Sequence, residues 1–404
     1  MSLDSSLISP DAAGRHAKFP TRALSRLFPR PDLGHLRLVL PNGDTIELES
    51  GQDGPFATVT LHRWRALWRM LRAGEVGFSD GYIAGDWSSC DLGAVLDFFL
   101  ANEAAFAGAA KSRIAKLLGR LSHRANENTR RGSRRNIAAH YDLGNAFYRH
   151  WLDADMNYSS AIYQAEPSLE AAQQNKLARI AHHLDLSGGE KVLEIGCGWG
   201  ALAEHLLRRF DVALTGVTLS RSQLDYARQR LASEIEAGRA GIHLQDYRDV
   251  TGSFERIVSV EMFEAVGERY WPVYFEKLRS CLAQGGAAVL QIITIAPSRF
   301  ETYRKRPDFI QRHIFPGGML PTVEAIERAA ANAKLKITCV ESFGASYART
   351  LQEWRRRFIG SWRDIEALGF DANFRRMWEY YLAYCEIGFS RDTVDVSIFK
   401  LSHG

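Results

Sequence analysis

A short apolar run that passes into three glycines spaced by two constrains this chain more than any other feature. It reads VLEIGCGWG and extends from Val192 to Gly200. The apolar and β-branched residues before the turn are typical of a strand buried on both faces. Glycine has no Cβ, so the backbone of such a turn can approach a ligand closely. Because the helical pattern ALAEHLLRRF follows at once, the segment predicts a ligand site at the carboxyl edge of a parallel sheet.

The charge beside this turn narrows the choice of ligand. The dinucleotide fingerprint is GxGxxG, whereas this turn reads GxGxG and has an acid two residues before its first glycine. A carboxylate there repels a pyrophosphate and suits a sulfonium or ammonium cation. The pattern resembles motif I of class I S-adenosylmethionine-dependent methyltransferases; a purely structural turn is the alternative. The resemblance implies cofactor contacts from Glu194, Gly196, Cys197, Gly198 and Gly200.

From residue 136 onwards, strand and helix patterns alternate. The candidate strands read KVLEIG, VALTGVTL, GIHLQ, FERIVSV, AAVLQIITI and KITCVESF. Strands separated by helical segments predict a doubly wound parallel sheet. We therefore expect residues 136–404 to form an α/β catalytic domain with a Rossmann-like, class I methyltransferase sheet. A long insertion over residues 296–321 is expected to build the substrate side of the site.

The region before it has a different organisation. Residues 1–30 are polar and contain prolines, as in a flexible tail. HLRLVLPNGDTIELES alternates apolar and polar residues around Asn-Gly, a strong hairpin signal. A third strand, a helix over 62–72, the glycine-punctuated segment GEVGFSDGYIAGDW and a second helix over 92–107 follow. This order predicts a small α+β domain over 31–110 and is similar to sterol-carrier-like lipid-binding domains; a dimerisation or docking module is the alternative.

Positive charge is concentrated in the segment between these regions. Residues 111–135 contain nine lysines or arginines and one acid, in a chain whose net charge is +4. Ile114, Leu117, Leu118 and Leu121 recur at helical spacing among these cations. The pattern predicts a basic amphipathic linker that binds an anionic lipid surface rather than nucleic acid. A solvated linker is the alternative.

Cysteine usage and hydropathy exclude several classes of protein. The five cysteines are far apart and form no CxxC pair, so neither a disulfide framework nor a metal site is expected. No basic region followed by an apolar run opens the chain, and the apolar stretch 92–110 is interrupted by Asp97 and Glu103. We expect a cytoplasmic protein without a membrane-spanning helix.

Further sequence blocks follow one another in a set order. They read AHYDLGNAFYRHWLDADMNYSSAIY, GVTLSRSQLDYA, LQDYRDV, RIVSVEMFEAVG, HIFPGGMLP and ESFGASYARTLQEW. In this order they resemble the cyclopropane fatty acid synthase and mycolic acid methyltransferase family, from about residue 74 to 399. The resemblance implies an S-adenosylmethionine-dependent enzyme that methylates the cis double bond of unsaturated acyl chains in phospholipids, giving a cyclopropane or methyl-branched product.

The resemblance also implies the residues around the cofactor. They are Tyr158 and Ser159 at the methionine end, Thr218, Leu219, Ser220 and Gln223 after the second strand, and Gln245, Asp246 and Tyr247 at the adenine. The second strand ends VTLS and lacks the carboxylate that usually holds the ribose. We therefore expect Ser220 and Gln223 to make part of those hydrogen bonds. An ordinary helix N-cap at Ser220 is the alternative.

Methylation of an alkene leaves a carbocation, so the site must be dry, aromatic and equipped with a base. In the family the proposed base is a bound bicarbonate ion. The matching positions here are Ser160, through its backbone N–H, Glu264, Gln291 and Tyr347. Gln291 stands where the family has histidine, and an amide cannot titrate near neutral pH. Ring closure and methyl branching therefore both remain open.

The remaining expectations concern Cys385 and the partners. Cys385 matches a cysteine sometimes labelled catalytic in the family, but its flanking tyrosines favour a packed thiol that lines the acyl pocket. We expect a peripheral protein at the inner face of an anionic phospholipid membrane, with an unsaturated acyl chain as substrate and no nucleic acid; a homodimer is open. The rival functions are a small-molecule N- or O-methyltransferase and a lipid-binding protein whose catalytic site has decayed.

Overall fold

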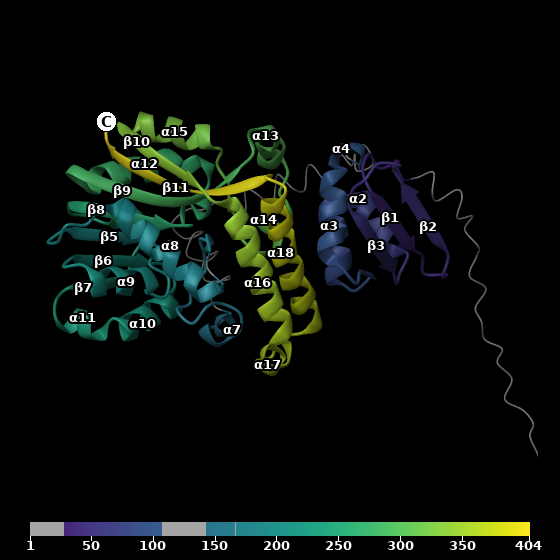
Figure 1. Cartoon of the computed structure of the whole chain (residues 1–404), viewed down its shortest axis with the longest axis horizontal. Helices are drawn as coiled ribbons and strands as arrows, with labels where there is room; N and C mark the ends of the chain where they lie inside the picture. Colours follow the sequence, from purple (N-terminus) through teal and green to yellow (C-terminus); the bar gives the residue numbers. More distant parts are fainter. Residues whose placement is uncertain (1–27, 107–142, 166) are drawn as a thin grey trace, which may run out of the picture.

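The computed structural model describes residues 28–106, 143–165 and 167–404. The predicted tail up to residue 27, the basic segment 111–135 with its expected helix, and the start of the predicted catalytic domain lie outside the described residues. Two β-sheets organise the described chain, one of four strands near the N-terminus and one of seven strands (Figure 1).

The N-terminal sheet has the strand order β2-β1-β3-β4. Its strands are β1 (His35–Val39), β2 (Thr45–Glu49), β3 (Phe56–Leu61) and β4 (Trp87–Ser88). β1 and β2 pair antiparallel on either side of Asn42-Gly43, as the hairpin signal predicts, and β3 pairs parallel with β1. The helices of this region are α2 (Arg65–Ile83), α3 (Leu92–Ala101) and α4 (Glu103–Phe106).

Helix α2 differs from the expectation of a short helix followed by a glycine-rich break. It continues to Ile83 and bends at Gly74, whose φ is 59°. The later glycines allow close packing instead of ending the helix. A Cβ at Gly81 would lie 3.0 Å from the indole of Trp87, so the glycine spacing there reflects contact with a large side chain.

The seven-stranded sheet has the order β10-β11-β9-β8-β5-β6-β7. Its strands are β5 (Lys191–Ile195), β6 (Ala213–Thr218), β7 (Ala240–Leu244), β8 (Phe254–Val260), β9 (Leu282–Ile295), β10 (Leu335–Ser342) and β11 (Val394–His403). The neighbouring strands from β7 to β9 are parallel, and β11 is antiparallel to both β9 and β10. The predicted α/β class is confirmed. The sheet is mixed, because the unpredicted strand β11 lies between β9 and β10.

Helices cover both faces of this sheet. The side chain of Val192 joins a hydrophobic cluster with α8 (Leu169–Leu184), α9 (Ala201–Arg209) and α10 (Arg221–Arg230). The next residue, Leu193, joins the cluster on the opposite face. That cluster contains α12 (Trp271–Cys281) and α15 (Val323–Asn332). Burial on both faces explains the unbroken apolar run of β5.

Short helices connect these elements. They are α7 (Asn145–Arg149), α11 (Ala232–Glu236), η1 (Tyr247–Asp249), η2 (Phe263–Ala265), η3 (Glu268–Tyr270), α13 (Pro297–Lys305), α14 (Phe309–His313) and α17 (Trp362–Ala367). α13 and α14 are formed by the predicted insertion 296–321. In the described part of the chain, no helix combines the length and apolar character needed to cross a membrane.

Two long helices stand between the sheets (Figure 1). α16 (Gly344–Gly360) and α18 (Ala372–Ser390) pack on each other; α16 also contacts β11, and α18 contacts α2 and α3. Their aromatic side chains belong to the same hydrophobic cluster as the N-terminal sheet; Trp354 and Trp378 are fully buried in it. The N-terminal region therefore shares its core with α16 and α18.

Candidate active site

A cavity of about 2180 Å³ runs from the glycine turn after β5 to helices α2 and α3. Most of the predicted site residues line it. They are Tyr158, Ser159, Glu194, Gly196, Cys197, Gly198, Thr218, Leu219, Gln223, Gln245, Tyr247, Glu264, Tyr347 and Cys385. Five predicted residues do not form its wall, and they are Ser160, Gly200, Ser220, Asp246 and Gln291.

The three glycines of the turn have different surroundings. Gly196, Gly198 and Gly200 all have positive φ, at 84°, 52° and 84°, where residues with a Cβ are strained. A Cβ at Gly196 would lie 3.1 Å from Cγ of Met262 on the cavity wall. A Cβ at Gly200 would instead lie 3.3 Å from Cβ of Ala227. Gly200 therefore lets α9 begin close to α10, while Gly196 and Gly198 face the cavity.

A buried carboxyl group and a buried amine, Glu194 and Lys176, lie beside the turn. The Oε2 atom of Glu194 is buried and has no hydrogen-bond partner among the described residues, and burial raises the Glu194 pKa to about 8. Lys176 of α8, which the sequence analysis did not identify, donates to Oγ of Ser159 at 2.8 Å. Burial lowers the Lys176 pKa to about 8. A bound cation would lower the Glu194 pKa again, so this unpaired carboxyl oxygen beside open glycine backbone fits a cationic cofactor such as S-adenosylmethionine.

The end of β6 positions a glutamine at the cavity. The hydroxyl of Thr218 donates to Oε1 of Gln223 at 2.9 Å. Ser220 accepts from the backbone N–H of Gln223 at 3.3 Å and caps α10. Ser220 therefore has the N-cap bond that the sequence analysis named as an alternative, and its cofactor contact stays a prediction. Gln223 lines the cavity.

Two of the three residues expected at the adenine line the cavity. Gln245 and Tyr247 face it, whereas Asp246 between them is buried away from its wall. The carboxylate of Asp246 accepts from the guanidinium of Arg248, with 2.8 Å between Oδ1 and Nε. Its local role is to cap η1 and hold Arg248.

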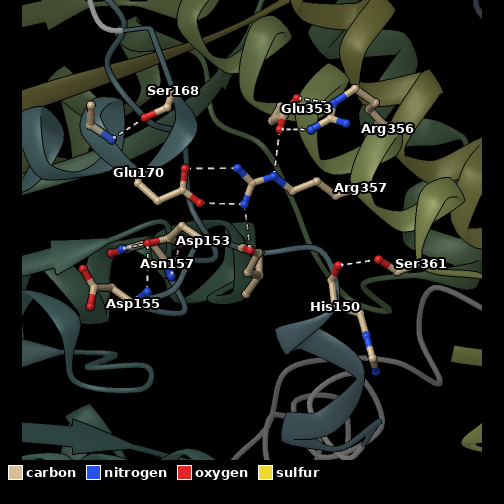
Figure 2. A network of polar contacts seen from close by, with 12 residues as sticks. His150, Asp153, Asp155, Asn157, Ser168, Glu170, Glu353, Arg356, Arg357 and Ser361 are labelled. Carbon is tan, nitrogen blue, oxygen red and sulfur yellow. Dashed lines mark hydrogen bonds and ion pairs between the residues drawn. The ribbon is translucent and has the colours of Figure 1, made fainter. Parts of the chain in front are cut away.

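The loop that carries Tyr158, Ser159 and Ser160 is fixed by a polar network (Figure 2). Arg357 of α16 donates to Glu170 at the start of α8, at 2.7 Å, and to the carbonyl of Leu152 at 3.2 Å. Asp153 accepts from the backbone and side-chain amides of Asn157, each at 2.7 Å. The network ties the start of this loop to α8 and α16.

The backbone N–H of Ser160 donates to Glu261, the residue that follows β8. The sequence analysis did not identify Glu261 as a site residue. Its Oε1 accepts from the backbone N–H of Ser160 at 2.8 Å and from the side-chain amide of Gln291 at 2.7 Å. Its Oε2 accepts from the hydroxyl of Tyr347 at 2.6 Å. Three groups that the family resemblance assigns to a bicarbonate ion thus converge on a carboxylate of the chain itself. Burial raises the Glu261 pKa, and these hydrogen bonds and the charge of Lys176 oppose the rise.

Glu264, the fourth of those positions, lies next to this group on η2. One of its oxygens accepts from the backbone N–H of Ile293, and the other is buried without a partner in the described structure. Burial, and then the charge of Glu261, raises the Glu264 pKa to about 8. The two carboxyl groups therefore differ: donors surround Glu261, whereas Glu264 is protonated near neutral pH.

The wall between the two ends of the cavity is rich in aromatic side chains. It includes Phe315, Tyr158, Tyr347, Tyr380, Tyr381, Tyr384 and Phe389. The rings of Tyr347 and Phe389 lie 4.4 Å apart between centroids, and the hydroxyl groups of Tyr158 and Tyr381 are 2.9 Å apart. Cys385 lies in this wall, and burial raises its thiol pKa well above the usual range. A protonated thiol among tyrosines has the surroundings of a packing residue.

Comparisons with known proteins agree with this architecture. The family model described as mycolic acid cyclopropane synthetase matches residues 128–399. Tuberculostearic acid methyltransferase UfaA1 of Mycobacterium tuberculosis is 38% identical over 372 residues, which cover 89% of this chain and 86% of that protein. Cyclopropane-fatty-acyl-phospholipid synthase of Escherichia coli K12 is 35% identical over 348 residues, covering 83% and 85%.

A solved structure of a mycolic acid cyclopropane synthase is also similar to this chain. The mycolic acid cyclopropane synthase CmaA1, in complex with SAH and CTAB, superposes with a TM-score of 0.62 at 28% identity. The match covers 66% of this chain and 97% of CmaA1. With the glycine turn, the sheet order and the cavity, these matches show that the chain is a methyltransferase and belongs to the mycolic acid cyclopropane synthetase family.

Proposed function

We propose that this methyltransferase transfers the methyl group of S-adenosylmethionine to the cis double bond of an unsaturated acyl chain in a membrane phospholipid. The observation that carries the proposal is the cavity: one end is the cofactor turn, and the other reaches the apolar side chains of α2 and α3. A long apolar chain would fit such a space, and a small polar substrate would leave most of its wall unused. The product is a cyclopropane or methyl-branched acyl chain.

In this proposal the glycine turn and its neighbours bind the cofactor. Glu194 and the open backbone at Gly196 and Gly198 would hold it, with Gln223 and Tyr247 farther along the wall. When bound, S-adenosylmethionine supplies an electrophilic methyl group. The aromatic wall excludes water and presents ring faces that stabilise positive charge on the acyl chain.

A base must then take a proton from the methylated chain. The family resemblance implies a bicarbonate ion held by Ser160, Glu264, Gln291 and Tyr347. In this chain the N–H and O–H groups of three of these residues already bond to Glu261. The identity of the base is therefore a separate question from the methyl transfer itself.

We also propose that the mouth of the cavity faces an anionic membrane. Trp68 and Leu71 of α2 are 62% and 43% exposed in the described structure. Arg72 of α2 lines the cavity, as do Arg306 and Arg312, and Arg312 forms an ion pair with Asp80 of α2. Exposed apolar side chains next to arginines suit a headgroup layer. The protein would act from the cytoplasm as a peripheral protein at the inner face, with residues 111–135 adding affinity; a homodimer belongs to the same proposal.

The test uses purified protein with vesicles that contain unsaturated anionic phospholipid. We expect S-adenosylhomocysteine to form only with these vesicles, and the acyl chains to gain the mass of one CH₂ group. NMR of the lipid distinguishes a ring from a branch. Vesicles of saturated lipid are the control. Turnover that is independent of the double bond, or methylation of a soluble amine or alcohol instead, would contradict the proposal.

A further inference from the structure

We propose that Glu261 is the base of this enzyme, so that a carboxylate of the chain, and not a bound bicarbonate ion, accepts the proton that the methylated acyl chain loses. The inference rests on the proposed function, since it concerns the same reaction. It assigns a catalytic role to a residue that the family resemblance does not point to.

The hydrogen bonds around Glu261 leave one acceptor position for this proton. A carboxylate offers about four lone-pair sites. Oε1 accepts two hydrogen bonds, from Ser160 and Gln291, and Oε2 accepts one, from Tyr347. Among the described residues, Oε2 therefore keeps one site without a donor. Ser160 and Gln291 lie behind the cavity wall, whereas Glu261 and Tyr347 form part of it.

The same hydrogen bonds explain why a separate bicarbonate ion is not needed. Such an ion would require the N–H and O–H groups that already bond to Glu261. It would also bring a second negative charge next to the Glu261 carboxylate, which like-charge repulsion disfavours. The carboxylate of Glu261, which is part of the chain, thus takes the place that the bicarbonate ion would occupy.

The backbone of Glu261 supports a functional role independently. Its φ is 49°, in the left-handed region that non-glycine residues seldom adopt. Its N–H donates to the carbonyl of Gln291 at 2.8 Å. Strained positions of this kind persist where surrounding contacts hold them, and they cluster at active sites. A glycine would relieve the strain at Glu261 but would remove the carboxylate.

Two charged neighbours adjust the carboxylate for this task. Lys176 is buried, and its charge favours the ionised form of Glu261. Glu264, with a pKa of about 8, is protonated near neutral pH and adds little repulsion there. Three hydrogen-bond donors and the charge of Lys176 thus favour the ionised form of Glu261, while burial favours proton uptake, which suits a group that must accept a proton.

The proton transfer balances without another reactant. A C–H bond of the transferred methyl group breaks, and its proton goes to Oε2 of Glu261. The electron pair of that bond forms the closing C–C bond of a cyclopropane ring when the cation lies on the carbon next to the methylated one. If a 1,2-hydride shift first moves the cation to the methylated carbon, the same electron pair forms the C=C bond of a methylene branch. S-adenosylhomocysteine is the second product, and Glu261 later returns the proton to solvent.

The first test replaces the carboxylate by an amide. We expect Glu261→Gln to lower product formation by at least about 100-fold, because loss of a positioned base costs about 10²–10⁴-fold. S-adenosylmethionine binding, measured by calorimetry, should stay within about threefold, which shows that the cavity still folds. Glu327→Gln, at an exposed position of α15, is the matched control. Product formation by Glu261→Gln within threefold of the unchanged enzyme overturns the inference.

The second test asks for bicarbonate directly. The unchanged protein should form product at the same rate in buffer depleted of carbon dioxide, and ¹³C NMR should show no bound signal from labelled bicarbonate. The double variant Glu261→Gly with Gln291→His frees the donors and adds an imidazole. It should bind labelled bicarbonate and depend on it for turnover. Bound bicarbonate in the unchanged protein, or a rate that depends on it, overturns the inference.

The two proposals can fail separately. If the unchanged enzyme methylates no lipid, the proposed function fails, and the NMR measurement still decides whether Glu261 occupies the bicarbonate position. If the enzyme methylates lipid and Glu261→Gln does so equally well, only the role of Glu261 fails.

Discussion

The glycine turn and the Glu261 group line the same cavity but are built in opposite ways. The turn at 196–200 is one continuous segment, and it offers a ligand backbone and open space. The Glu261 group brings together side chains and one N–H from four separate segments: the end of β8, strand β9, helix α16 and the loop before α8. A continuous segment can be read from the sequence, whereas a group that converges from four segments depends on the whole fold.

The buried carboxyl groups at the turn and in the Glu261 group also differ in their hydrogen-bond partners. Glu194 at the turn has an oxygen without a partner, which suits a cationic ligand that arrives and leaves. Glu261 is held by three donors, which suits a group that must keep one position throughout a reaction. Lys176 lies between these roles, because its charge acts on both carboxylates.

The largest effect is expected from Gly196→Ala. The new Cβ would meet Met262 and fill the space where the cofactor approaches the backbone. We expect S-adenosylmethionine affinity, measured by calorimetry, to fall at least about 100-fold, since small displacements in such sites cost about that much. Gly189→Ala is the control, because Gly189 has a similar φ of 87° but nothing within 4 Å of its Cβ. Equal affinities in the two variants would show that the turn is only structural.

Glu194→Gln tests the carboxylate at the turn. Hydrogen bonds to charged groups contribute about 1.5–3 kcal/mol, so we expect affinity to fall about 10–100-fold. Because the Glu194 pKa is about 8 and only the ionised form attracts a cation, affinity in the unchanged protein should rise with pH up to about 8. The variant should lose most of this dependence in calorimetry from pH 6 to 8.5. A variant with unchanged affinity and unchanged pH dependence would remove Glu194 from the cofactor site.

These two variants probe a segment whose place in the fold the sequence predicts well. VLEIGCGWG and the helix pattern after it locate the turn, because the strand, the glycines and the helix are consecutive in the sequence. The exceptions, Gly200, Ser220 and Asp246, have local structural roles that one sequence cannot separate from ligand contacts. The antiparallel strand β11 was missed for another reason: its pairing partners, β9 and β10, are distant in the sequence.

The Glu261 group shows where sequence reasoning stops. Ser160, Glu264, Gln291 and Tyr347 were identified by resemblance, and the structure places all four close to one carboxylate. The segment EMFEAVG contains two glutamates three residues apart directly after a strand. Nothing in the segment says which one turns toward Gln291, because the left-handed backbone at Glu261 sets that direction.

Lys176→Met tests whether the two ends are coupled. Without the ammonium group, the pKa values of Glu194 and Glu261 should rise further, since the charge of Lys176 lowers both. Each carboxylate then ionises only at higher pH. We expect product formation at pH 7 to fall about 10-fold, the change that corresponds to about one pKa unit, and to recover partly above pH 8. Lys191→Met, at the exposed start of β5, is the control. A uniform loss at every pH would indicate a structural role alone.

The smallest effect is expected from Cys385→Ala. This variant tests a residue of the cavity wall that belongs neither to the glycine turn nor to the Glu261 group. Burial keeps the Cys385 thiol protonated, because its pKa lies far above neutral, and neither Glu194 nor Glu261 bonds to it among the hydrogen bonds of the described residues. Product formation should stay within about threefold, and stability should fall by about 1 kcal/mol through lost packing. Rates with phospholipid vesicles and thermal unfolding check this. If product formation is abolished while cofactor binding persists, the thiol takes part in the chemistry. The assignment of cofactor binding to the turn and of proton transfer to Glu261 alone is then wrong.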